Sequence, residues 1–307
     1  MSVFGHIFKG FLRLAGRLPL RVHYAFGTFV AFLAEKVLHY RTADVMINLS
    51  RSFPEMKYDD LKELSHSFYR HFGDIIAETI WFGACRSRER LVRQNICEIV
   101  NPEVLQRSFD NSPSVMVMYS HCGNWELFGG MLYYNNTEHP FTVKEDDICV
   151  VYKRLSSSMW DWIMKDNRCA PLEKRDTFEG YVESNDLMRF ALRHRGRKMV
   201  YNINTDQSPY YNAAGTVDVD FLHQPTRSMT GAATLANRLG FSVLYLNMRP
   251  VSRGHYLIEF TPICDDASKV SPEEIVGQYY RLLEKDINAM PHNYLWSHRR
   301  WKIEIEK

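Results

Sequence analysis

The chain has 307 residues, of which 45% are hydrophobic and 24% are charged, and its formal net charge at pH 7 is +2. This balance is typical of a folded protein and excludes a disordered chain. Six cysteines lie scattered without a C-x-x-C pair, so zinc ligation has no support from spacing and a disulfide framework is not expected. We therefore expect reduced thiols in a cytosol-facing protein. It would have one main domain, residues 42–307, and an N-terminal segment, residues 1–41.

The N-terminal segment holds most of the charge asymmetry. It contains six lysines and arginines against one acid, a charge of +5, whereas the remaining chain is at −3. Its longest apolar run, residues 24–34, has eleven residues, which is short of the roughly 20 that span a bilayer. The pattern predicts an amphipathic segment in the headgroup plane of an anionic membrane. The alternative is an ordinary helical hairpin, broken at Pro19 and packed on the domain. Because the residues between the charges are apolar, the segment fits lipid better than nucleic acid.

Helical and strand patterns alternate along the rest of the chain. Helical spacing dominates residues 59–82, where His66, His71 and Asp74 are expected on a solvated face rather than as metal ligands. Further helices are predicted over 102–109, 157–166, 185–195, 228–238 and 272–289, and strands over 97–100, 115–119, 148–152, 198–203, 217–221, 242–247 and 256–261. Such alternation predicts an α/β fold with a mainly parallel or mixed central sheet flanked by helices.

Residues 114–130, SVMVMYSHCGNWELFGG, carry the strongest candidate for chemistry. The apolar run predicts a strand that ends at His121, and a helix begins after a tight turn, with Glu126 in its first turn. On a regular helix, side chains five residues apart point about 140° away from each other. His121 and Glu126 therefore meet only across a bend, which Gly123 supplies, and Asn124 is a fitting N-cap for the helix.

This geometry predicts that Glu126 holds one ring nitrogen of His121 and leaves the other free to take a proton from a hydroxyl. Taken alone, the pair is a weak signal, because a histidine hydrogen-bonded for structural reasons would have the same pattern.

Other polar residues also follow predicted strands, and the carboxyl ends of parallel strands gather at one edge of a sheet. Arg154 could bind phosphate or stabilise an oxyanion, or form a surface ion pair. Asp206 and Gln207 could bind sugar hydroxyls or anchor Arg154, or form a turn before Pro209. We expect these side chains near His121.

The block SHCGNWELFGG resembles the His-x4-acid motif of the glycerolipid acyltransferase superfamily, and its glutamate variant resembles the late acyltransferases of lipid A biosynthesis, the lauroyl and myristoyl transferase family. The likeness extends over most of the chain, through Asn48-Leu49, residues 52–55 (SFPE), 151–154 (VYKR), 206–207 (DQ), the small-residue helix 230–239 and the closing block 291–302 (PHNYLWSHRRWK).

The resemblance implies that His121 is the general base and Glu126 its partner, and it places Asn124, Arg154, Asp206 and Gln207 in the substrate pocket. The implied reaction moves an acyl chain from an acyl carrier protein thioester to a hydroxyl of a lipid A precursor at the cytosolic face of the inner membrane. No metal or other cofactor is expected, because a thioester is already activated.

Three other functions stay open at this point. The same fold could acylate another lipid acceptor, such as an aminolipid or glycolipid. It could use water as the acceptor and act as a hydrolase. It could also bind lipid at a membrane surface without turnover, although a binding module has no need of a histidine, two acids and an arginine at strand ends.

Overall fold

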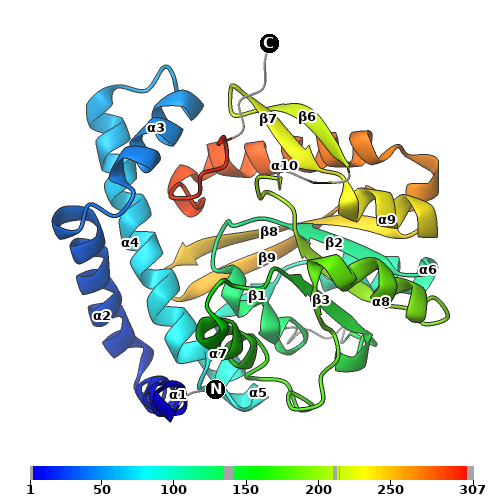
Figure 1. The fold of residues 1–307 in the computed structure, drawn as a ribbon, viewed down its shortest axis with the longest axis horizontal. Coiled ribbons are helices and arrows are strands. Elements are labelled where there is room, and N and C mark those ends of the chain that lie inside the picture. The colour runs from blue at the N-terminus through cyan, green and yellow to red at the C-terminus, as the bar shows by residue number, and fades with distance from the viewer. Residues whose placement is uncertain (1–2, 135–140, 210–212, 214, 303–307) are drawn as a thin grey trace.

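A central sheet with strand order β1-β9-β8-β2-β5-β3-β4 runs through the computed structural model, which describes residues 3–134, 141–209, 213 and 215–302 (Figure 1). Neighbouring strands are parallel except for the antiparallel pair β8 and β9, so the predicted mixed α/β fold is confirmed. The strands are β1 (Cys97–Ile99), β2 (Val115–Tyr119), β3 (Ile148–Tyr152), β4 (Tyr181–Glu183), β5 (Val200–Asn204), β8 (Ser242–Ser252) and β9 (His255–Cys264).

Helices cover both faces of the sheet and form two hydrophobic cores with it. One core takes side chains from α4, α8, α9 and α10, and the other takes side chains from α5, α6, the end of α4 and the 3₁₀ segment η2. The α-helices are α1 (Val3–Ala15), α2 (Leu20–Phe32), α3 (Thr42–Ser52), α4 (Tyr58–Phe82), α5 (Arg88–Gln94), α6 (Pro102–Asn111), α7 (Ser158–Arg168), α8 (Leu187–Arg193), α9 (Gly231–Leu239) and α10 (Pro272–Ala289). The shorter helical segments are the π-helical turn η1 (Leu33–Val37) and the 3₁₀ segments η2 (Trp125–Tyr133), η3 (Glu145–Asp147), η4 (Ser184–Asp186), η5 (Ala267–Lys269) and η6 (Pro291–Asn293).

Strand β2 lies in the middle of the sheet, between β8 and β5. All five of its residues are buried, as expected for a parallel strand covered on both faces. Ser120 and His121 follow β2 directly. His121 therefore lies at the centre of the carboxyl edge of the sheet, where open α/β sheets bind their ligands.

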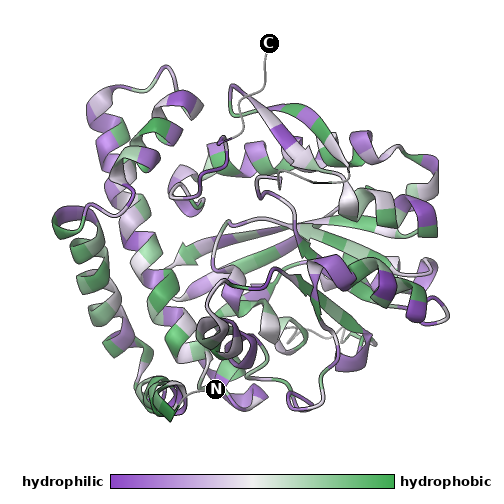
Figure 2. Ribbon diagram, in the orientation of Figure 1, coloured by the Kyte–Doolittle hydropathy of each residue, from purple (hydrophilic) through white to green (hydrophobic). Residues whose placement is uncertain are grey.

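The N-terminal segment forms a helical hairpin packed on the domain, and it also leaves many apolar side chains exposed. Its two helices break at Pro19, and α2 crosses α4 where Gly27 meets Gly73 so closely that a Cβ on Gly73 would lie 2.2 Å from the Gly27 carbonyl oxygen. Figure 2 colours much of α1 and α2 as hydrophobic, and large apolar side chains are exposed at Val3, Phe4, Ile7, Phe11, Leu14, Val22, Phe26, Phe29 and Phe32. In the part of the chain that the structure describes, no helix has the length and apolar character needed to cross a membrane.

Several element predictions differ from the structure. The strand predicted over 217–221 does not join the central sheet, because β6 (Thr216–Phe221) pairs with β7 (Gln224–Met229) in a separate antiparallel hairpin. Leu222 and His223 form its two-residue turn, both with positive φ, although this turn type usually uses asparagine, aspartate or glycine. Helix α9 therefore begins after this hairpin rather than at residue 228, and α3, α5 and β4 are additional elements.

Candidate active site

His121 is held by a buried carboxylate from the neighbouring strand. Its Nδ1 lies 2.8 Å from Oδ1 of Asp206, and its backbone N–H donates to Oδ2 of the same residue at 3.2 Å. Asp206 follows β5, the strand beside β2, so two adjacent strand ends bring the pair together. Burial alone would raise the pKa of Asp206, but the charge of His121 and the hydrogen bond from its ring outweigh burial and lower that pKa. The carboxylate is therefore ionised at neutral pH, and it fixes the tautomer that leaves Nε2 of His121 as the acceptor.

The predicted contact between Glu126 and His121 is replaced by a different pairing. Nε of Arg168 donates to Oε2 of Glu126 at 2.6 Å, and Nη2 donates to Oε1 at 2.7 Å, so the guanidinium binds the carboxylate through two bonds. Arg168 ends α7, and the segment after Asn124 is 3₁₀ rather than α-helical, which directs Glu126 toward that helix.

Trp125 is the one link between the two pairs that the described contacts provide. Its Nε1 donates to Oε1 of Glu126 at 2.9 Å, and its ring lies edge-on to His121 with 4.7 Å between the centroids. The described contacts therefore connect Glu126 to His121 through this indole.

The predicted bend at Gly123 is confirmed. Its φ is +67°, and an added Cβ would lie 2.7 Å from Cγ and 2.8 Å from the carbonyl oxygen of Met248. The Gly123 N–H also donates to Oδ1 of Asn293 at 3.0 Å. Only glycine fits this turn without moving the backbone of β8.

Asn124 supports the loop from inside the protein. Its Oδ1 accepts from the Glu126 N–H at 3.2 Å, and its Nδ2 donates to Oε2 of Glu78 at 2.9 Å. The side chain is fully buried and does not line the cavity beside His121. The structure therefore does not bring Asn124 into the cavity, because its amide is occupied by the interior carboxylate of α4.

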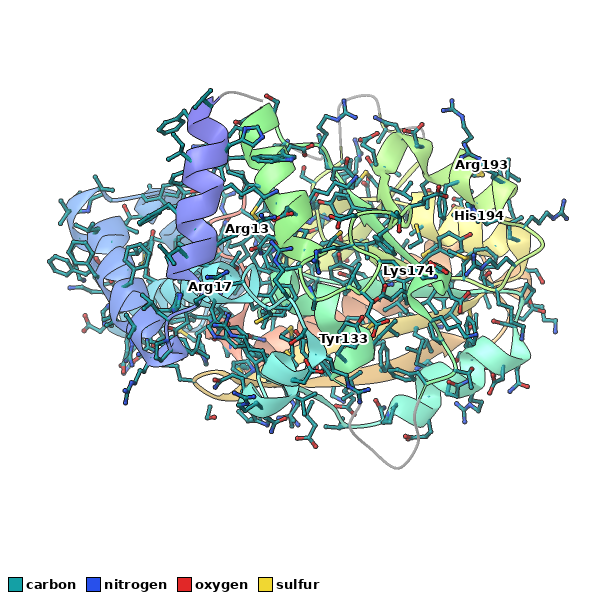
Figure 3. All side chains as sticks on the ribbon, turned by 90° about the horizontal axis from the view of Figure 1, so that it is seen from below. Arg13, Arg17, Tyr133, Lys174, Arg193 and His194 are labelled. Atoms are coloured by element: carbon teal, nitrogen blue, oxygen red, sulfur yellow. The ribbon has the colours of Figure 1, made fainter. Side chains whose placement is uncertain are left out.

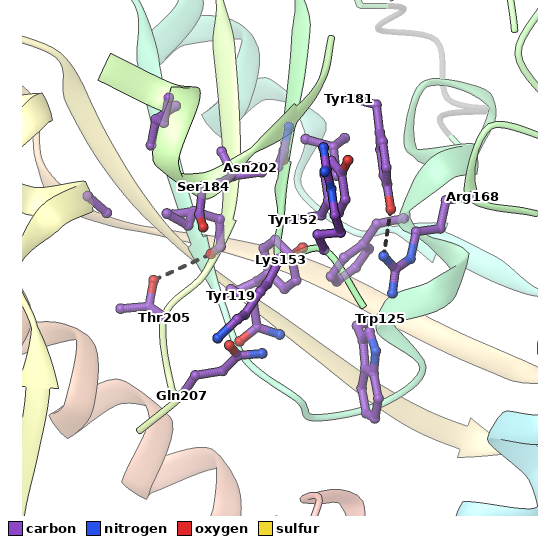
Figure 4. A pocket seen from close by; sticks show the side chains of 18 of the residues that line it. Tyr119, Trp125, Tyr152, Lys153, Arg168, Tyr181, Ser184, Asn202, Thr205 and Gln207 are labelled. Carbon is purple, nitrogen blue, oxygen red and sulfur yellow. Dashed lines mark hydrogen bonds between the residues drawn. The ribbon is translucent and has the colours of Figure 1, made fainter. Parts of the chain in front are cut away.

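A cavity of about 850 Å³ opens beside His121 (Figure 4). Arg154 and Gln207 both line it, as expected from their places after β3 and β5, and Nε2 of Gln207 lies 3.5 Å from Nε2 of His121. Figure 4 shows Lys153 and Gln207 pointing toward each other near the centre of the cavity. Most of the wall is apolar, with side chains from both faces of the sheet: Trp125, Phe128, Met131, Leu132, Ile148, Val150, Val151, Leu172, Phe178, Leu187, Met188, Ile203, Met229, Ala232 and Leu235.

Two residues beside the site were not singled out as site residues from the sequence. Arg168 follows an unremarkable helical pattern, and its partner is fixed only by how α7 packs. His298 belongs to the closing block of the chain, and its ring centroid lies 5.9 Å from that of His121. Burial lowers the pKa of His298 to about 4, so this ring is neutral at pH 7 and adds no positive charge beside His121. Among the described residues no group of three or more His, Cys, Asp or Glu side chains could hold a metal ion.

A histidine whose Nδ1 is held by an ionised aspartate, and whose Nε2 is next to a mainly apolar cavity, has the geometry of a general base for a substrate with a long hydrocarbon part. The fold and the site thus define an α/β protein with a histidine–aspartate pair at the opening of a mainly apolar cavity.

Comparison with known proteins identifies the family. The family model described as bacterial lipid A biosynthesis acyltransferase matches residues 3–303, so the chain belongs to that family. The chain is also 24% identical over 310 residues to the lipid A biosynthesis lauroyltransferase of Escherichia coli (strain K12), an alignment that covers 97% of this chain and 90% of that protein. The resemblance seen in the sequence motifs is confirmed, and the activity of the family is acyl transfer in lipid A synthesis.

Proposed function

We propose that the protein transfers a fatty acyl chain from an acyl carrier protein thioester to a hydroxyl of a lipid A precursor at the cytosolic face of the inner membrane. The observation that carries this proposal is the His121–Asp206 pair beside a large apolar cavity. A thioester is activated for attack, so the protein has to supply a base, a place for hydrocarbon and correct orientation.

In the proposed reaction, Nε2 of His121 takes the proton of the acceptor hydroxyl while its oxygen attacks the thioester carbonyl. The new C–O ester bond forms, the C–S bond breaks, and the proton passes from His121 to the leaving thiolate of the carrier. Asp206 is a positioning residue that orients the imidazole and stabilises its charged form.

Glu126 and Arg168 are positioning residues in this proposal. Their paired bonds hold the Trp125 ring against His121, and Arg168 also donates to the Tyr181 hydroxyl at 2.8 Å at the cavity wall. Arg154 and Gln207 contact the polar part of the substrates.

Membrane contact is assigned to α1 and α2, which combine exposed phenylalanines with basic side chains. Helix α1 packs on α7, where Phe8 contacts Trp160 edge-on and Lys9 pairs with Asp166 at 2.9 Å. Because α7 ends in the cavity wall at Arg168, a membrane bound by α1 would lie close to the cavity. This supports a peripheral enzyme that takes its acceptor from the lipid surface.

The test incubates purified protein with acyl carrier protein donors of several chain lengths and an under-acylated lipid A precursor, and follows the product by mass spectrometry. His121→Ala should lose transfer, and Asp206→Asn should lower kcat at least 100-fold by loss of the correct tautomer, with both proteins folded. Glu126→Gln should lower both kcat and the melting temperature, because it leaves Arg168 without its charged partner. His66→Ala, an exposed histidine on α4, is the control.

Full activity of His121→Ala would refute the mechanism. Release of free fatty acid without acylated lipid would show a hydrolase instead, and binding without turnover would show a lipid-binding protein. Acylation of an aminolipid or glycolipid in place of the precursor, seen in the total lipids of a deletion strain, would change the acceptor but keep the site.

A further inference from the structure

Helix α8 carries a basic surface that the reaction chemistry does not use. We call the exposed side chains of Met188, Arg189, Leu192, Arg193 and Arg195 the α8 surface. Arg189 and Arg193 are four residues apart, as are Met188 and Leu192, so a basic stripe and an apolar stripe lie side by side on the helix. Figure 3 places Arg193 and His194 on the opposite side of the molecule from α1.

The surface has uncompensated positive charge. Residues 183–198 contain five lysines and arginines against two acids. Within the described parts of the chain, Arg193 and Arg195 make no ion pair, whereas Arg189 has only an exposed pair with Asp186 at 3.0 Å. Exposed pairs of this kind contribute little to stability, so structural pairing does not account for these arginines.

The helix begins at the mouth of the active-site cavity and is packed firmly on the domain. The inner side of α8 is buried through Leu187, Phe190 and Ala191. The His194 ring stacks on Phe190 with 4.1 Å between the centroids. Leu187 and Met188 also line the cavity. The cavity wall therefore continues directly into the α8 surface, so a partner seated there would have the opening within reach.

The surfaces on two sides of the cavity differ in character. Helices α7 and α8 lie on either side of β3 (Figure 1), and α7 joins the cavity to the apolar N-terminal helices. The α8 surface has only two exposed large apolar residues among its arginines, Met188 and Leu192, which fits a charged protein surface better than the interior of a bilayer.

We propose that the α8 surface docks the acyl carrier protein, an acidic partner, so that its thioester arm enters the cavity between α8 and the loop with Lys153 and Arg154. This inference rests on the proposed function, because it names the surface for the donor of that reaction. Complementary charge at such a rim raises the rate of encounter and fixes orientation, and salt weakens it.

The experiment compares two donors with the same acyl chain, the acyl carrier protein thioester and the acyl-pantetheine thioester that lacks the protein. For the full-length Arg193→Glu/Arg195→Glu variant, KM for the carrier protein donor should rise at least tenfold, while kcat/KM for acyl-pantetheine stays within twofold. Raising the salt from 50 to 300 mM should increase KM for the carrier protein in the wild type and much less in the variant. The control, Arg281→Glu/Lys285→Glu, makes the same charge change on exposed residues of α10 and should behave as wild type.

Three results would overturn the inference. An unchanged KM for the carrier protein in the α8 variant would remove α8 as the docking surface while leaving the proposed function intact. A raised KM for the lipid precursor alone would assign the arginines to anionic lipid. A wild-type protein that uses acyl-pantetheine but not the carrier protein would refute both this inference and the donor of the proposed function.

Discussion

Replacing Glu78 by glutamine should stabilise the protein above pH 7 and leave it nearly unchanged at pH 5. Glu78 is completely buried on α4 and accepts hydrogen bonds from the Tyr24 hydroxyl at 2.8 Å, the Tyr256 hydroxyl at 2.8 Å and the Asn124 amide at 2.9 Å. A glutamine oxygen can accept from Asn124 and Tyr256, and its amide can donate to Tyr24, whose hydroxyl is able to turn. The substitution therefore keeps the shape and the contacts of protonated Glu78.

The magnitude follows from the pKa. Burial raises the pKa of Glu78 from 4.5 to about 7, against the opposing effect of its three hydrogen bonds. A group whose pKa is raised in the folded state gives stability that is present below the unfolded pKa and is lost as the pH rises through the folded pKa. At 1.36 kcal/mol for each pH unit, ionising Glu78 in the native protein costs about 3 kcal/mol, of which at least about 2 kcal/mol develops between pH 5 and pH 8.5.

The assay measures the free energy of unfolding in urea at pH 5 and at pH 8.5 for the wild type, Glu78→Gln and Glu63→Gln. Glu63 is exposed on the same helix, so its substitution should change stability by less than about 0.5 kcal/mol at either pH. The Glu78→Gln minus wild-type difference should grow by about 2 kcal/mol from pH 5 to pH 8.5. A difference that stays constant with pH would show that Glu78 does not carry a proton in the folded protein at neutral pH.

Two further predictions concern Gly123 in the active-site loop and His71, which is buried on α4 rather than on the solvated face expected from the sequence. Gly123→Ala should lower the free energy of unfolding, measured in urea, by at least about 2 kcal/mol and should remove transfer activity, because φ is +67° and the new Cβ meets Met248. The control is Gly196→Ala, since a Cβ on Gly196 would have no atom within 4 Å. Equal effects of the two substitutions would refute the packing argument. Burial lowers the pKa of His71 to about 4. The stability that the neutral His71 ring gives the folded protein is therefore present above pH 6.5, the pKa of an unperturbed histidine, and is lost as the pH falls toward 4. In the Glu78→Gln background, His71→Asn should recover about 2 kcal/mol of the loss between pH 7 and pH 4.5, and an unchanged acid loss would contradict it.

The sequence was enough to predict that polar residues meet at the carboxyl edge of the sheet. His121, Arg154 and Asp206 follow β2, β3 and β5, and these strands are neighbours, so the rule that parallel strand ends gather was sufficient to bring them together. The choice of carboxylate was not predictable. Glu126 is near His121 along the chain, but a 3₁₀ segment turns it to Arg168, whereas Asp206 is 85 residues away and fills the position beside Nδ1.

The other features that the sequence did not predict arise from contacts between segments that are distant along the chain. The close contact between Gly27 and Gly73 depends on how α2 crosses α4, which neither helical segment reveals by itself. The hairpin turn at Leu222 and His223 uses residues that do not favour positive φ, so local propensity opposed the fold, and tertiary packing decided it. His298 lies beside the site because the chain after α10 returns to the loop that follows β2, where Asn293 accepts from the Gly123 N–H, and no periodicity in the sequence predicts this return.

The contacts of Glu78 join the N-terminal segment to the chemistry. Tyr24 on α2 donates to Oε1 of Glu78, and Oε2 of the same carboxylate accepts from Asn124, which in turn accepts the N–H of Glu126. Three hydrogen bonds, two of them buried, thus run from the proposed membrane-binding helix to the residue that holds Arg168. An anchor that only tethered the enzyme would need no such connection, and buried polar groups are costly unless every partner is in place. The hydrogen bonds therefore connect α2 to the loop of the candidate active site as well as placing it against α4.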